Sequence, residues 1–287
     1  MQSCRTRFRE STWSCTLRLT RLAAAAVALA VVTTAVARVT AAEKVQFKLH
    51  HVGSYRGEVC DVADFNNDQV LDIVAGNFIY LGPDFRPVKI RSIQTDINDE
   101  GKGYDWDFMN APLDVDGDGQ LDVVSCSWFG MQVEWYRNAW DLANNKVGGE
   151  LWTATLVHKN SNYECGELMD LDGDGKRQEV VTATKATEWY EVGTDADGKR
   201  GLIRYVVDPD ENKHTFGIGV GDVNGDGRPD ILRPAGWYEA PADIRTGTWK
   251  EHPLAVGGEE GKADHTPQIL VYDVNADGLN DIITSTA

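Results

Sequence analysis

Five short acidic segments in this sequence carry oxygen-bearing side chains at regular positions, so each could hold a divalent cation. Counted from the first aspartate, positions 1, 3 and 5 are Asp or Asn, and position 9 is Asp in four of the five segments. Calcium takes about six to eight oxygen ligands, and acids so close together repel one another unless a cation lies between them. We therefore predict five calcium loops, numbered 1 to 5 along the chain. The predicted ligands are Asp64, Asn66, Asp68 and Asp72 in loop 1; Asp114, Asp116, Asp118 and Asp122 in loop 2; Asp170, Asp172, Asp174 and Glu179 in loop 3; Asp222, Asn224, Asp226 and Asp230 in loop 4; and Asp273, Asn275, Asp277 and Asp281 in loop 5.

The five loops differ in ways that predict unequal binding. Glycine, which tolerates the backbone of a sharp bend, fills position 6 in four loops, but loop 1 has Gln69 there. Loop 3 is one residue longer, so Glu179 is expected to supply its last ligand after a bulge. Asn at position 3 of loops 1, 4 and 5 lowers their negative charge and predicts weaker binding. No His or Cys lies among the ligands, which argues against zinc, and no Glu stands at position 12, which argues against EF-hands.

The segments around each loop predict β-strands. A run of apolar and small residues precedes every loop and a β-branched run follows it, which is the pattern of a hairpin. An aromatic pair such as Trp135-Tyr136 or Trp189-Tyr190 comes next in most repeats, and a fourth alternating run ends the unit. Units of four strands that recur about every fifty residues are typical of propeller blades. We therefore predict an all-β fold, a β-propeller of four-stranded blades, with five units visible and the fifth incomplete.

The ends of the repeat region suggest how the ring would close. Phe47–Val52 resembles the fourth run of a unit but precedes loop 1, so we expect it to complete the last blade. The chain stops at Ala287, a few residues after loop 5. We expect either a C-terminally truncated product or a complete version with more blades.

The first 42 residues predict a secretory signal peptide. A basic segment, Met1 to Arg21, precedes an uncharged run from Leu22 to Ala37 and small residues up to Ala42. The alternative is a retained membrane anchor, for which the run is short. We expect cleavage that leaves residues 43–287 as the propeller, without a stable membrane span. The mature protein would then be secreted, periplasmic or on the cell surface.

The net charge excludes some classes of partner, and the cysteine count argues against a disulfide-bonded scaffold. The net charge of −17 disfavours nucleic acid and anionic lipid as partners. Three cysteines, Cys60, Cys126 and Cys165, follow the signal segment. They cannot all pair within one chain, and we expect them to be small buried core residues.

The repeated segment Asp114-Val-Asp-Gly-Asp-Gly-Gln-Leu-Asp-Val-Val and its four counterparts resemble the FG-GAP and VCBS repeats of integrin-α-like propellers. The resemblance covers roughly residues 44–287, and the bacterial VCBS branch is the nearer match because Phe-Gly and Gly-Ala-Pro elements are poorly kept. It implies a calcium-binding propeller, commonly of seven blades. Members include adhesins, lectin-like modules and a few enzymes acting on sugars, so the fold alone does not choose a function.

A second group of residues could line the axis of such a propeller. Counting back eight residues from each loop gives Arg56, Trp106, Asn162, His214 and His265, with Glu164 nearby. We predict Arg56, Trp106, Glu164, His214 and His265 as ligand-binding residues and assign no catalytic residue. The leading hypothesis is an exported, calcium-binding module for binding, adhesion or scaffolding, with an extracellular protein or carbohydrate as ligand. The alternative is a carbohydrate-active enzyme, a lyase, dehydratase or isomerase, with its site in the axial funnel.

Overall fold

Each predicted calcium loop joins two antiparallel strands, as the hairpin pattern predicts. The computed structural model describes residues 46–147, 150–184, 186–214, 216–256 and 268–284. Residues Val52–Ala287 form one unit and Met1–His51 another. The predicted signal peptide lies outside the described residues. Among the described residues, no helix has the length and apolar character needed to cross a bilayer.

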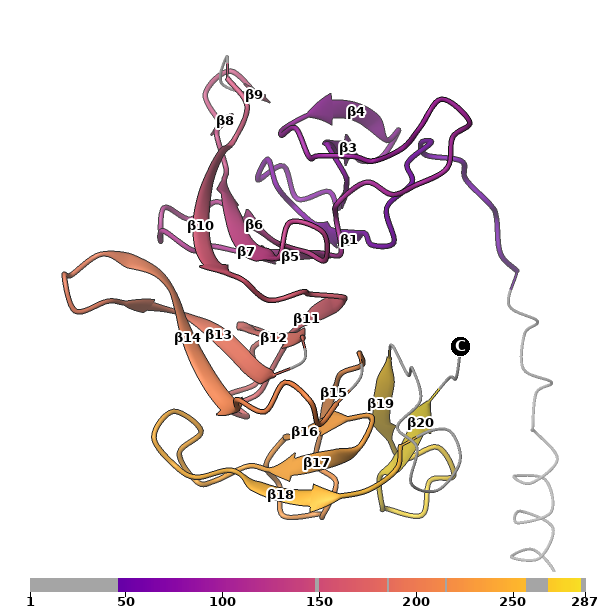
Figure 1. Ribbon diagram of the computed structural model, residues 1–287. Helices are drawn as coiled ribbons and strands as arrows, with labels where there is room; N and C mark the ends of the chain where they lie inside the picture. The colour runs from indigo at the N-terminus through magenta and orange to yellow at the C-terminus, as the bar shows by residue number, and fades with distance from the viewer. Residues whose placement is uncertain (1–45, 148–149, 185, 215, 257–267, 285–287) are drawn as a thin grey trace, which may run out of the picture. The chain divides into compact units, whose positions relative to one another are not determined.

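Within the described residues, four sheets contain four antiparallel strands each, and two more contain two strands each (Figure 1). Sheet 1 is β1 (Asp61–Ala63), β2 (Asp72–Ala75), β3 (Phe78–Leu81) and β4 (Arg86–Lys89). Sheet 2 is β5 (Met109–Leu113), β6 (Asp122–Ser127), β7 (Gln132–Arg137) and β10 (Thr153–Lys159), with the small hairpin β8 (Trp140–Asp141) and β9 (Lys146–Val147) inserted before its last strand. Sheet 3 is β11 (Cys165–Met169), β12 (Glu179–Ala183), β13 (Thr187–Thr194) and β14 (Arg200–Asp208). Sheet 4 is β15 (Gly219–Gly221), β16 (Asp230–Arg233), β17 (Gly236–Glu239) and β18 (Lys250–Pro253), and sheet 5 is β19 (Ile269–Tyr272) and β20 (Asp281–Thr284).

The strand order within each four-stranded sheet follows the chain, so every sheet is a meander. First strands of neighbouring sheets touch one another in three places: β1 touches β5, β5 touches β11, and β15 touches β19. The predicted all-β fold of four-stranded units is therefore confirmed, and its arrangement is β-propeller-like.

The β-branched pairs after each loop explain how neighbouring sheets stack. Successive side chains of a strand point to opposite faces. Val123 accordingly packs in the cluster between sheets 1 and 2, whereas Val124 packs in the cluster between sheets 2 and 3. The two halves of the aromatic pair divide in the same way, because Trp189 faces sheet 4 and Tyr190 faces sheet 2. Trp135, Tyr136, Trp189 and Tyr190 are therefore packing residues of the core, because all four are buried.

Sheet 5 has a more exposed surface than the others. Leu270 is 55% exposed, Tyr272 67% and Val274 60%, whereas Val115, which matches Val274 in loop 2, is fully buried. A side chain at this position of the loop is therefore covered only where another sheet packs against it.

The expectation about the closing strand was wrong, and the one about buried cysteines was right only in part. Phe47–Val52 forms no strand, and Phe47 and Leu49 are almost fully exposed. The physical reason is that a strand needs a hydrogen-bonded neighbour, and sheet 5 has only two strands in the described chain. Of the three cysteines, Cys126 is buried as expected, Cys165 is half-buried, and Cys60, which directly precedes β1, is exposed.

Candidate metal sites

All five loops share one backbone shape. Positions 4 and 6 both have a positive φ, for example 80° at Gly117 and 86° at Gly119 in loop 2. Loop 1 reaches the same shape with Asn67 at 56° and Gln69 at 68°, and loop 5 places Ala276 at 60°. Side chains with a Cβ are disfavoured there. The strain predicted for Gln69 is therefore present, and Ala276 adds a second strained position that the sequence analysis missed.

The acidic side chains hold this shape through a repeated set of hydrogen bonds. In every loop, the amide of position 6 donates to the carboxylate of position 1, at 2.8 to 3.0 Å. The amide of position 5 donates to the side-chain oxygen of position 3, and that of position 7 to the carboxylate of position 5. Because each oxygen has a second lone pair, the bonds organise the loop while leaving the oxygens able to bind a cation.

The carboxylate at position 9 has a structural role that the sequence analysis missed. In loops 1, 2 and 4, Asp72, Asp122 and Asp230 are fully buried. One oxygen of each accepts the amide of loop position 2, and the other accepts the amide that follows the third strand, as Asp122 does from Val115 and Asn138. Glu179 accepts the amide of Leu171, so in the longer loop 3 it makes the hydrogen bond that position 9 makes elsewhere. The only signal in the sequence is an acid placed directly before a buried β-branched pair.

Burial disfavours the ionised form of the carboxylate at position 9. Burial raises the pKa of Asp122 to about 7, despite the two amide hydrogen bonds that lower it. Burial raises the pKa of Asp72, Glu179 and Asp230 in the same direction. A cation beside these groups would favour their ionised form.

Loops 2 and 3 each bring three of their own carboxylates close enough to share one ion. Among the described residues, ligand oxygens of Asp114, Asp116 and Asp122 lie within 4.8 Å of one another, and so do those of Asp170, Asp172 and Asp174. Calcium–oxygen distances of about 2.3–2.6 Å allow two ligands to be about 5 Å apart. Asp170 also has a buried Oδ1 without a hydrogen-bond partner in the described part of the chain. The donor set, which is entirely oxygen, therefore fits calcium.

The remaining predicted ligands are arranged differently. Loops 1, 4 and 5 have Asn at position 3, and no group of three clustered acids is found at them within the described residues. Asp118 lies outside the loop 2 triad and pairs with Arg137, 3.0 Å away, which also contacts Asp116. Arg245 contacts Asp172 of loop 3 at 3.1 Å. These guanidinium groups would compete with a metal ion for the same oxygens.

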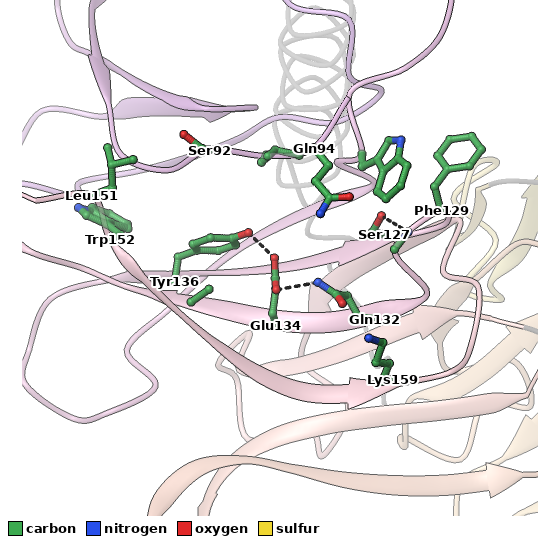
Figure 2. A pocket seen from close by; sticks show the side chains of 14 residues that line it. Ser92, Gln94, Ser127, Phe129, Gln132, Glu134, Tyr136, Leu151, Trp152 and Lys159 are labelled. Atoms are coloured by element: carbon green, nitrogen blue, oxygen red, sulfur yellow. Dashed lines mark hydrogen bonds between the residues drawn. The ribbon is translucent and has the colours of Figure 1, made fainter. Parts of the chain in front are cut away.

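The residues predicted to line the axis lie in several environments. Arg56 lines a shallow hollow of about 410 Å³ together with Tyr55, Glu58 and Tyr104. Trp106 lines a separate cavity of about 530 Å³ (Figure 2). Glu164 is half-buried directly before β11, where its amide donates to the carbonyl of Ala183. His265 lies outside the described residues.

His214 is buried and hydrogen-bonded inside the protein. Its Nε2 lies 2.7 Å from the hydroxyl of Tyr238, which in turn donates to Asp208. Because the Tyr238 hydroxyl donates to Asp208, it accepts from His214, which places the proton of the neutral imidazole on Nε2. Burial lowers the pKa of His214 from 6.5 to about 3, and the nearby Arg233 acts in the same direction. This histidine is therefore neutral at physiological pH.

The His214→Gln variant is expected to lose less stability than the wild type when the pH falls from about 7 to 5. The pKa is lower in the folded than in the unfolded protein, so between pH 6.5 and about 3 only the unfolded state takes up the proton. The contribution of His214 is present above pH 6.5 and is lost as the pH falls. Urea unfolding at about pH 7 and pH 5 should show a loss that is about 1 kcal/mol smaller in His214→Gln. An equal loss in the wild type, in this variant and in the exposed control His51→Gln would contradict the assignment.

Three comparisons with known proteins were made. An FG-GAP-like repeat family matches residues 114–182, from the first aspartate of loop 2 through loop 3 and into β12. No curated protein matches the chain. Among 23 solved chains that match is a crystal structure of BBS1N in complex with ARL6DN, soaked with lead. That match has 10% identity and a TM-score of 0.37, and it covers 79% of this chain and 63% of the other. The chain thus spans less than two thirds of the length of that structure.

The family match coincides with the two loops whose carboxylates converge, and the surrounding sheets repeat the same hairpin. Residues 114–182 of this all-β chain are therefore an FG-GAP-like repeat.

Proposed function

We propose that this protein is an exported, calcium-binding β-propeller that acts as a binding, adhesion or scaffold module. The observation that carries the proposal is the convergence of three carboxylates in loops 2 and 3 on a loop shape that all five repeats share. Calcium would fix the turn between the first two strands of a sheet. It would also offset the repulsion among the acids of that loop.

Export is supported by the sequence of residues 1–42 and by the chemistry of the loops. Calcium modules outside the cell bind at about 0.1–1 mM, and loops with exposed acids and competing arginines suit that weak range. The acidic surface favours an extracellular protein or carbohydrate as partner over nucleic acid. The binding module has more support than the sugar-converting enzyme, because His214 faces a buried tyrosine.

Calcium titration by calorimetry tests the proposal. The wild type should show saturable binding with dissociation constants of about 0.1–1 mM. The double variant Asp116→Asn/Asp172→Asn should bind calcium clearly more weakly at these two sites, because it removes one carboxylate from each converging triad. Asp99→Asn, an exposed acid outside the loops, is the matched control. Unchanged calcium binding in the double variant would contradict the assignment.

A further inference from the structure

A cavity of about 530 Å³ lies between sheet 2 and the segment that follows β4, and no residue of the calcium loops lines it. One wall is the segment from Ser92 to Gln94 that follows β4, and the floor is formed by β7 and β10. Figure 2 shows the Gln94 amide and the Glu134 carboxylate reaching toward each other from these two sides. Trp106 and Phe129 form an aromatic rim, with ring centroids 5.7 Å apart.

The repeat in sheet 3 shows what a glutamate at the position of Glu134 can bind. Glu188 stands two residues before Tyr190 on β13, as Glu134 stands two residues before Tyr136 on β7. Both tyrosines donate their hydroxyl to the glutamate two residues earlier. The second oxygen of Glu188 accepts Nε and Nη2 of Arg204, with Nε at 2.7 Å. Sheet 3 thus holds a guanidinium group through two N–H donors that share one carboxylate oxygen.

Sheet 2 lacks that arginine because of one residue in the neighbouring strand. Arg204 is the register partner of Tyr190 across β13 and β14. The register partner of Tyr136 across β7 and β10 is Ala154, and Ala154 lines the cavity. Glu134 accepts the Tyr136 hydroxyl and, at 2.8 Å, the Gln132 amide. No cationic side chain forms an ion pair with it among the described residues.

The surroundings of Glu134 also suit a planar cation. Guanidinium groups bind well against aromatic faces, and Arg91 already lies 4.8 Å from the centroid of the Tyr136 ring. Trp106 and Phe129 offer further aromatic surface at the opening. The net charge of −17 attracts cationic ligands over a long range. Lys159 also lines the cavity, but it is exposed and forms no hydrogen bond with Glu134.

We propose that this cavity binds a guanidinium group from outside the chain, an arginine side chain of a peptide ligand, with Glu134 in the role that Glu188 plays toward Arg204. Gln94 and Gln132 would orient the group through hydrogen bonds, and the aromatic rim would cover the aliphatic stem. The proposal does not depend on calcium binding, so it can fail or succeed independently of the function proposed above.

The first experiment titrates the full chain with N-acetyl-arginine amide, followed by NMR or calorimetry in calcium buffer. Binding in the millimolar range is expected, with the neutral citrulline analogue binding at least about tenfold more weakly. Glu134→Gln should weaken arginine binding about tenfold or more, whereas the exposed control Glu150→Gln should leave it unchanged. Lys159→Gln should strengthen binding several-fold, because it removes a competing positive charge.

The second experiment uses the sheet 3 arrangement as a blocking mutation. Ala154→Arg places an arginine where Arg204 stands in sheet 3, so it should abolish arginine binding while the protein stays folded. Thr153→Arg adds the same charge on the opposite face of β10 and should not block the cavity. Equal affinity for the arginine and citrulline compounds, or unchanged binding in Glu134→Gln, would overturn the proposal. Weaker binding in Lys159→Gln, or binding of a methyl pyranoside in place of arginine amide, would also overturn it.

Discussion

Removing calcium is expected to lower the melting temperature of this protein by about 10–20 °C. A ligand that binds only the folded state stabilises it by about 2.7 kcal/mol at a hundredfold excess over the dissociation constant. The two loops with converging carboxylates would together contribute about 5 kcal/mol. For a chain of this size each kcal/mol shifts the melting temperature by about 2–4 °C. The acids of an empty loop repel one another, which acts in the same direction.

Differential scanning calorimetry in calcium and in EGTA measures this effect. Magnesium at the same concentration should restore little of the stability, because it demands a stricter octahedral geometry and retains water. The double variant Asp116→Asn/Asp172→Asn should respond much less to calcium than the wild type does. Coincident melting curves with and without EGTA would refute calcium as a structural ion.

Replacing Asp107 with Asn is expected to destabilise the protein by about 3–5 kcal/mol, the usual cost of breaking a buried ion pair. Asp107 and Arg91 are both fully buried and lie 3.2 Å apart. The carboxylate also accepts hydrogen bonds from the Tyr55 hydroxyl, the Gly76 amide, the Asn110 amide and the Ser125 hydroxyl. These donors come from sheets 1 and 2 and from the segment before β1, so one carboxylate ties them together. The variant leaves the Arg91 charge buried without its counterion.

Urea unfolding followed by tryptophan fluorescence measures the loss. Arg91→Met should also be strongly destabilising, but the double variant should cost clearly less than the two single costs together, because no buried charge remains unpaired. Asp84→Asn, which changes an exposed acid in the turn between β3 and β4, should change the unfolding free energy by less than about 0.5 kcal/mol. A loss below about 1 kcal/mol in Asp107→Asn would show that this pair does not hold the two sheets together.

The sequence by itself was enough to predict the repeat, the hairpins and the all-β class. Each of these depends on local patterns, because a loop with oxygens at alternate positions and apolar runs on both sides specifies a turn between two strands. The same is true of the strain at Gln69, since a bend that needs a positive φ is a local requirement. The β-branched pairs also predict strands buried on both faces, and Val123 and Val124 are buried in that way.

The tertiary structure decided which of the acidic residues could share an ion and which serve other purposes. Asp122, predicted only as a calcium ligand, also accepts the amide of Asn138 directly after β7. Asp107, which the sequence does not distinguish from other acids, forms a buried ion pair with Arg91. The difference between Glu134 and Glu188 depends on the residue across the neighbouring strand, Ala154 or Arg204. Such pairings are set by strand register and by packing between sheets, and a shift of one residue would change every partner. Local patterns fix the strands, whereas the contacts among distant side chains exist only once the sheets have packed.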